Sequence, residues 1–145
     1  MVVIIFLPGC GKKSFEAGSP EEVLSLIKDK GRTESVFGLY TNDTISMMKK
    51  YINISGMKNE SAVNILSFIP EKSEYTITDR KIDDKHCSMN LVFTKHDSEN
   101  AVGLVIAINM VKEGKNWKID RKNDFEKLIE SYEKKGAEEY LKKIR

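Results

Sequence analysis

The sequence predicts an α+β fold, in which N-terminal helices pack on a four-stranded antiparallel sheet and one further helix follows the sheet. Apolar residues recur every three to four positions up to Pro70 and alternate with polar residues beyond it, and the helical spacing returns after Asp120. The chain has 145 residues, which is enough for one domain with a core of its own.

The first half of the chain carries start and stop signals for helices. Ser19 can cap the first helix, because Pro20 follows at the first helical position and Glu22 completes a capping box. Gly31 marks the end of this helix. Apolar spacing predicts further helices at residues 36–40, 42–52 and 59–69, the last one closed by Pro70.

Strands are predicted after Pro70 because apolar and polar side chains alternate there, which is typical of half-buried antiparallel strands. The expected strands cover residues 75–78, 87–94, 102–111 and 117–120, with turns at 83–85, 97–100 and 113–116. The third strand is apolar on both sides. It is therefore predicted to be central and covered on both faces.

A final helix is predicted from Asn123 onward. Its apolar stripe consists of Phe125, Leu128, Ile129, Tyr132, Tyr140, Leu141 and Ile144. Acidic and basic residues nearly balance, and pairs such as Glu130 with Lys134 indicate a solvated face rather than a basic membrane-binding helix. We expect the stripe to shield the second face of the third strand at least through Tyr132, with the part beyond Gly136 held less firmly.

Residues 1–14 allow three interpretations. A phosphate-binding loop would need a glycine where Phe6 stands and a hydroxyl where Lys13 stands. A buried first strand over residues 2–7 would make Cys10 an ordinary small core residue. We favour the third interpretation, because the apolar run and residues 7–10 (LPGC) resemble a bacterial lipobox, whose cysteine receives diacylglycerol and becomes the new N-terminus.

Cys10 is therefore the predicted lipidation site. The predicted organisation is a residual signal peptide (1–9), a tether (10–18), a folded domain (19–122) and a C-terminal helix (123–145). No basic residues precede the apolar run, so we expect the natural start to lie further upstream. The expected location is the cell envelope, with a lipid in the membrane and the domain outside the cytoplasm.

Charge and metal-ligating residues exclude several function classes. The 24 basic and 22 acidic residues leave a net charge of +2, so nucleic acid is not an expected partner. With Cys10 acylated, Cys87 has no disulfide partner. His86 and His96 lie ten residues apart on one strand, or roughly 33 Å, and cannot share a site. We predict no metal, cofactor or catalytic residue.

Several segments, taken in order, resemble the nuclear transport factor two-like (cystatin-like) bacterial lipoproteins of unknown function. They are residues 19–23, 75–77, 81–84 and 111–120. The resemblance implies a strongly curved sheet that wraps the helices into a cone, whose mouth can hold a small apolar ligand. Members of this superfold include isomerases, dehydratases and binding modules, so the fold does not supply the function. The helix after Asp120 departs from the family pattern.

A pocket in this cone would be lined by residues from several strands. The candidates are Tyr75, Asp79, Met89, Asn109 and Trp117. We expect a lipid-anchored, non-catalytic binding or interaction module whose partner is a small apolar ligand or an envelope protein. The alternative is a small-molecule enzyme of the isomerase or dehydratase type with Asp79 as its acid-base group, although a lone polar residue lacks a partner for that chemistry. A solidly packed cone would favour the module, and an open pocket with a desolvated carboxylate would favour the enzyme.

Overall fold

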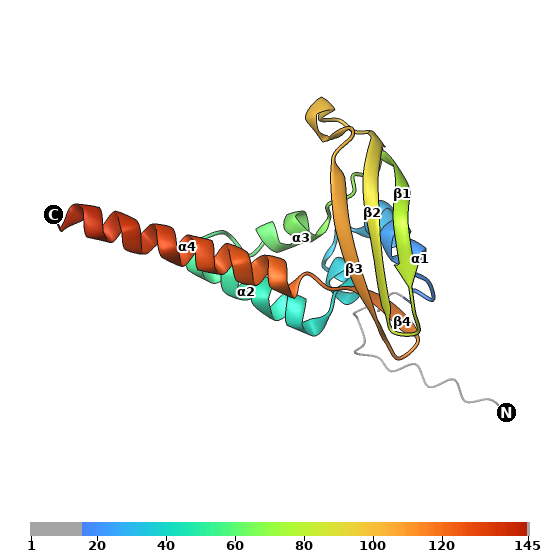
Figure 1. Ribbon diagram of the computed structural model, residues 1–145, viewed down its shortest axis with the longest axis horizontal. Coiled ribbons are helices and arrows are strands. Elements are labelled where there is room, and N and C mark those ends of the chain that lie inside the picture. Colours follow the sequence, from blue (N-terminus) through green and yellow to red (C-terminus); the bar gives the residue numbers. More distant parts are fainter. Residues whose placement is uncertain (1–15, 145) are drawn as a thin grey trace.

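A computed structural model describes residues 16–144, which form a four-stranded antiparallel sheet with helices before it and one long helix after it (Figure 1). This arrangement confirms the predicted α+β class. The elements are α1 (Pro20–Lys30), η1 (Glu34–Leu39), α2 (Asn42–Ser55), α3 (Ser61–Leu66), β1 (Glu74–Ile82), β2 (His86–Lys95), η2 (Glu99–Ala101), β3 (Val105–Glu113), β4 (Asn116–Ile119) and α4 (Lys122–Lys143). The predicted signal peptide, Cys10 and most of the tether lie outside the described residues.

Helix α1 begins as the sequence predicts. The Ser19 hydroxyl accepts a hydrogen bond from the Glu22 N–H, Pro20 occupies the first turn, and the Glu22 carboxylate accepts from the Gly18 N–H at 3.0 Å. These contacts satisfy donors that a helix start leaves free. An ion pair between Glu21 and Arg80 then ties α1 to β1.

The four strands pair in the order β1-β2-β3-β4. β4 is short and pairs only with Met110–Glu113 of β3. After it, the Asp120 N–H still donates to the Asn109 carbonyl at 2.8 Å, but the Arg121 N–H donates to the Thr44 hydroxyl on α2 at 2.9 Å. The chain therefore leaves the sheet early, and β3 forms its edge along residues 105–108.

The third strand is central as predicted, because β3 lies between β2 and β4, but the prediction that it starts at residue 102 and is covered on both faces is wrong. Residues 102–104 precede β3, half of the strand lies at the edge, and Val105 is 61% exposed. Ala107 is exposed on the same outer face, where the neighbouring residues of β2 are Asn90 and Val92. Short apolar side chains scattered among polar ones are tolerated in water. The apolar residues on the outer face of β3 therefore do not require a helix or a second molecule to cover them.

The core lies between the inner face of the sheet and the N-terminal helices. Its fully buried large side chains are Leu24, Ile27, Leu39, Tyr40, Met48, Leu66, Ile69, Met89, Leu91, Met110, Ile119 and Phe125. The one phenol in this group, Tyr40, donates to the Leu66 carbonyl at 2.6 Å, so its hydroxyl is buried with a partner. The inner side of the sheet is thus packed with helix side chains.

Helix α4 packs beside α2 and then extends past it (Figure 1). Phe125 and Ile129 are 1% and 4% exposed, whereas Leu128 and Tyr132 are 42% and 45% exposed. The expected docking on the sheet through Tyr132 is therefore wrong in both partner and extent. α2 ends at Gly56, which adopts a left-handed conformation with φ of 72°, so it leaves the later turns of α4 without a surface to pack on.

The two edges of the sheet differ in how they are protected. β1 pairs irregularly between Thr78 and Lys81, and Asp79 stands in the bulge with φ of 52°. Charged side chains and bulges of this kind discourage further strand pairing. The free edge of β3, residues 105–108, carries neither a charge nor a proline.

Candidate functional site

The five residues predicted to line one pocket lie on opposite faces of the sheet. Met89 and Trp117 are 2% and 4% exposed and belong to the core, and Tyr75 packs half-buried against it. Asp79 and Asn109 are exposed on the outer face. The structure therefore separates the apolar candidates from the polar ones, and no inner cavity joins them among residues 16–144.

Asp79 reaches the outer face because of the bulge in β1. Two-residue alternation from Tyr75 and Ile77 would place it inward, but the extra residue and its positive φ turn the side chain outward. There its carboxylate accepts a hydrogen bond from the Asn90 amide at 3.0 Å. An exposed carboxylate with a neutral amide partner is poorly suited to acid-base catalysis.

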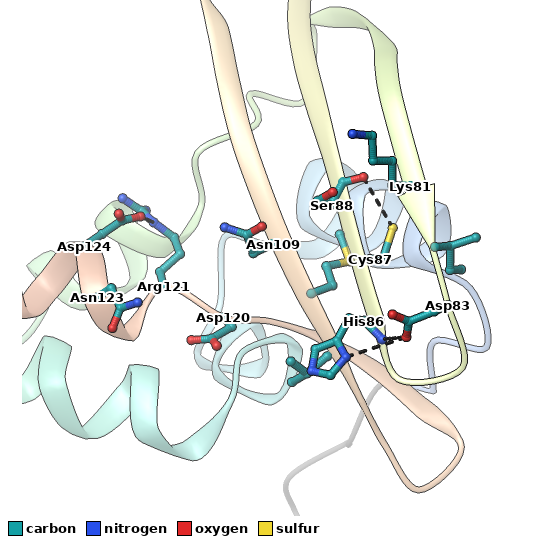
Figure 2. A pocket seen from close by; sticks show the side chains of 13 residues that line it. Lys81, Asp83, His86, Cys87, Ser88, Asn109, Asp120, Arg121, Asn123 and Asp124 are labelled. Atoms are coloured by element: carbon teal, nitrogen blue, oxygen red, sulfur yellow. Dashed lines mark hydrogen bonds and ion pairs between the residues drawn. The ribbon is translucent and has the colours of Figure 1, made fainter.

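Asn109 lines a groove of about 440 Å³ between the outer face of the sheet and the start of α4 (Figure 2). The walls come from the β1–β2 hairpin on one side and from the first turn of α4 on the other. Its polar lining residues are Lys81, Asp83, His86, Ser88, Asn109, Asp120, Arg121, Asn123 and Asp124. The groove is thus an open, mixed-charge surface.

Two of these groups stabilise the hairpin. The Asp83 carboxylate accepts from the N–H groups of Lys85 and His86, both at 2.8 Å, and these bonds hold its pKa below the usual value. The His86 ring lies 3.6 Å from the same carboxylate. Among the described residues Ser88 makes no hydrogen bond to His86, so the three side chains do not form a nucleophile-base-acid chain.

At the other wall, Arg121 is engaged by its own helix. Its guanidinium lies 3.3 Å from the Asp124 carboxylate and 5.2 Å from the centre of the Phe125 ring. These contacts hold the arginine side chain over the first turn of α4, and the Arg121 N–H donates to Thr44 of α2. Sequence analysis did not single out Arg121, although a basic residue just before a helix and four positions before a buried aromatic was a usable signal.

Tyr75 lines a separate groove of about 410 Å³ with Ser25 and Asp29 of α1. Burial raises the pKa of its phenol. This groove lies on the helix side of β1, whereas Asn109 lies across the sheet. The two surfaces have no polar residue in common.

The described residues, 16–144, do not support metal binding or thiol chemistry. No group of three His, Cys, Asp or Glu side chains in this part of the chain could hold a metal ion. His86 and His96 stand at opposite ends of β2, and His96 accepts from the Ser98 N–H at 2.9 Å. Cys87 is buried, which raises the pKa of its thiol and disfavours the reactive thiolate.

The exposed apolar surface is concentrated on α4 instead. Ten large hydrophobic side chains are exposed in the described part of the chain. Four of them are on this helix, Leu128, Tyr132, Tyr140 and Leu141, and a fifth, Ile144, caps its C-terminus. No helix within residues 16–144 has the length and apolarity needed to cross a bilayer. An exposed apolar stripe on a charged helix is typical of a protein contact.

Comparisons with known proteins give no further constraint. No family model, no curated protein and no solved structure matches this chain.

Proposed function

We propose that this protein is a non-catalytic interaction module of the bacterial cell envelope, held at the membrane by diacylglycerol on Cys10. The anchor rests on residues 7–10 (LPGC), which resemble a lipobox and follow an apolar run. The finer fold proposed for the domain is the nuclear transport factor two-like (cystatin-like) cone. Its partners would be the membrane, through the lipid, and an envelope protein, because the packed interior leaves no room for the small apolar ligand that the cone could otherwise hold.

The observation that carries the non-catalytic proposal is the packing of the inner sheet face. A ligand-binding cone needs space between the sheet and the helices, and here Met89, Leu91 and Met110 are fully buried against helix side chains. Small-molecule sites are usually concave and largely preformed. The enzyme alternative would need a desolvated acid-base group, whereas its candidate Asp79 is exposed and bonded to Asn90.

Lipidation is tested by expressing the gene, together with its natural upstream sequence, in a bacterium grown with labelled palmitate. We expect the protein in the membrane fraction with label incorporated, and we expect Cys10→Ser to lose both. Label that persists in Cys10→Ser would disprove the anchor. A Cys87→Ser variant is the matched control, because it removes the buried thiol and should leave labelling unchanged.

A further inference from the structure

The free edge of β3, residues 105–108, has backbone hydrogen-bonding groups that no strand within residues 16–144 takes up. In an antiparallel strand, the backbone groups of successive residues point to opposite sides. The Asn109 carbonyl accepts from the Asp120 N–H at 2.8 Å, so odd-numbered residues of β3 face away from β2. The N–H and C=O groups of Val105 and Ala107 therefore point out of the free edge.

An open groove of about 210 Å³ lies beside the same edge. Its apolar walls are Phe68, which follows α3, Ile106 and Ile108 of β3, and Ile119 of β4. The two charged residues that line it, Arg121 and Asp124, lie 3.3 Å apart and pair with each other. Because the charges are already paired and the walls are apolar, the groove suits an uncharged apolar side chain.

The sheet blocks its other edge and leaves this one open. β1 has a bulge at Asp79, followed by the charged residues Arg80 and Lys81, and such features discourage further pairing. The free edge of β3 has only small or aliphatic side chains, and Val105 is 61% exposed on its outer face. An unblocked edge of this kind is what proteins use to bind an extended peptide as an added strand.

The existing ladder indicates where an added strand would run. β4 pairs antiparallel with Met110–Glu113 and the chain leaves that line at Asp120, so a strand opposite residues 105–108 would continue the line of β4. Because β4 already covers the rest of β3, two copies of this chain could share only residues 105–108. Such a contact buries far less than the roughly 1,200 Å² of a standard stable interface. A short peptide uses the same edge and also fills the groove.

We propose that the free edge of β3 is the partner-binding surface of this protein, and that it takes up an extended, proline-free peptide segment of an envelope protein in line with β4. Main-chain hydrogen bonds to Val105 and Ala107 supply the affinity, and the groove beside Phe68 accepts a Val, Ile or Leu side chain of the peptide. This inference rests on the proposed interaction function and names the class of partner. It does not depend on the lipid at Cys10.

The test titrates a synthetic octapeptide, three Thr-Val pairs between terminal lysines, into the ¹⁵N-labelled Cys10→Ser chain up to millimolar concentration. We expect the amide signals of residues 105–108 to shift, because main-chain bonds at an edge tolerate different peptide sequences. Ala107→Pro should weaken binding about fivefold or more, because it removes an outward N–H and spares the β2–β3 ladder. Ala107→Val keeps the N–H, so this matched control should bind like the parent chain.

The peptide supplies a second control that needs no variant of the protein. N-methylation of two consecutive central amides blocks both edges of the peptide and should abolish the shifts. Shifts that survive N-methylation or Ala107→Pro would indicate apolar adhesion and would overturn the proposal. The absence of any shift at millimolar peptide would overturn it as well.

Other occupants of the edge have their own signatures, and each would overturn the proposal. Concentration-dependent shifts at residues 105–108 without peptide would indicate a second copy of this chain. Different signals there in the full chain and in a chain that begins at residue 10, again without peptide, would indicate that residues 2–7 occupy the edge. All these measurements use protein without lipid, so failure here leaves the palmitate test of the anchor unaffected.

Discussion

The two halves of α4 have the same backbone conformation and a similar mixture of charges, yet only one half has a packing partner. The first half buries Phe125 and Ile129 against α2 and forms an ion pair between Lys122 and Glu126. The second half is exposed throughout. The difference arises because α4 has 22 residues and α2 has 14, while both begin at nearly the same place.

An amphipathic stripe therefore identifies a surface that can pack, and the length of the neighbouring element decides how much of it does. Propensity and i,i+4 charge pairs contribute only a few tenths of a kcal/mol each to a helix. Burial of one large apolar side chain contributes about 1.5–3 kcal/mol. We expect the stability conferred by α4 to fall steeply where α2 ends.

The largest effect is expected at Phe125, which is 1% exposed. Phe125→Ala should lower the free energy of unfolding by about 3–5 kcal/mol, because it leaves a cavity between α4 and α2. Chemical denaturation followed by circular dichroism measures this. Phe125→Leu retains most of the apolar volume and should cost less, so an equal loss in both variants would argue against cavity formation.

The next largest effect is the difference in stability loss expected between two neighbouring positions on α4. Ile129→Ala should cost about 2–4 kcal/mol, because Ile129 is 4% exposed. Leu128→Ala should cost less than about 1 kcal/mol, because Leu128 is 42% exposed. Chemical denaturation of both variants measures the two losses in free energy of unfolding. Similar losses would mean that α4 packs through a different face.

Removal of the distal segment of α4, residues 133–144, should have little effect on the stability of the domain. A chain that ends at Tyr132 should change the free energy of unfolding by no more than about 0.5 kcal/mol in dilute solution, because the lost side chains are exposed. A large drop in dilute stability would instead show that the distal segment packs on its own domain.

Amide hydrogen exchange of the unmutated protein should reveal the same boundary between the packed and the exposed half of α4. In dilute protein, we expect amides near Phe125 and Ile129 to exchange only on wide opening of the domain, and those beyond Tyr132 to exchange by local fraying. Uniform protection along α4 would contradict the boundary.

Most of the fold could be predicted because local signals and burial agree in most of the chain. The cap at Ser19, the break at Pro70 and the alternation along β2 each determine the structure within a few residues. The positions of the hairpins followed from turn residues such as Asp83. These features depend on neighbours in sequence.

The predictions that were wrong concern contacts between distant segments. The partner of α4 depends on the Arg121 N–H bonding to Thr44, which no local pattern encodes. The coverage of β3 depends on where β4 stops. At the candidate site, one bulged residue reversed the side on which Asp79 stands, because strand alternation has a period of two and the insertion of one residue inverts it.

The uncovered edge of β3 also exposes the protein to aggregation. Residues 105–108 (VIAI) combine high β-propensity with no charge and no proline, and their outward backbone groups can template another strand. Chains concentrated on a membrane surface would meet edge to edge most often. The same short segment that ends the sheet is therefore the place where aggregation would begin, and a lysine in place of the exposed Ala107 would oppose it without disturbing the core.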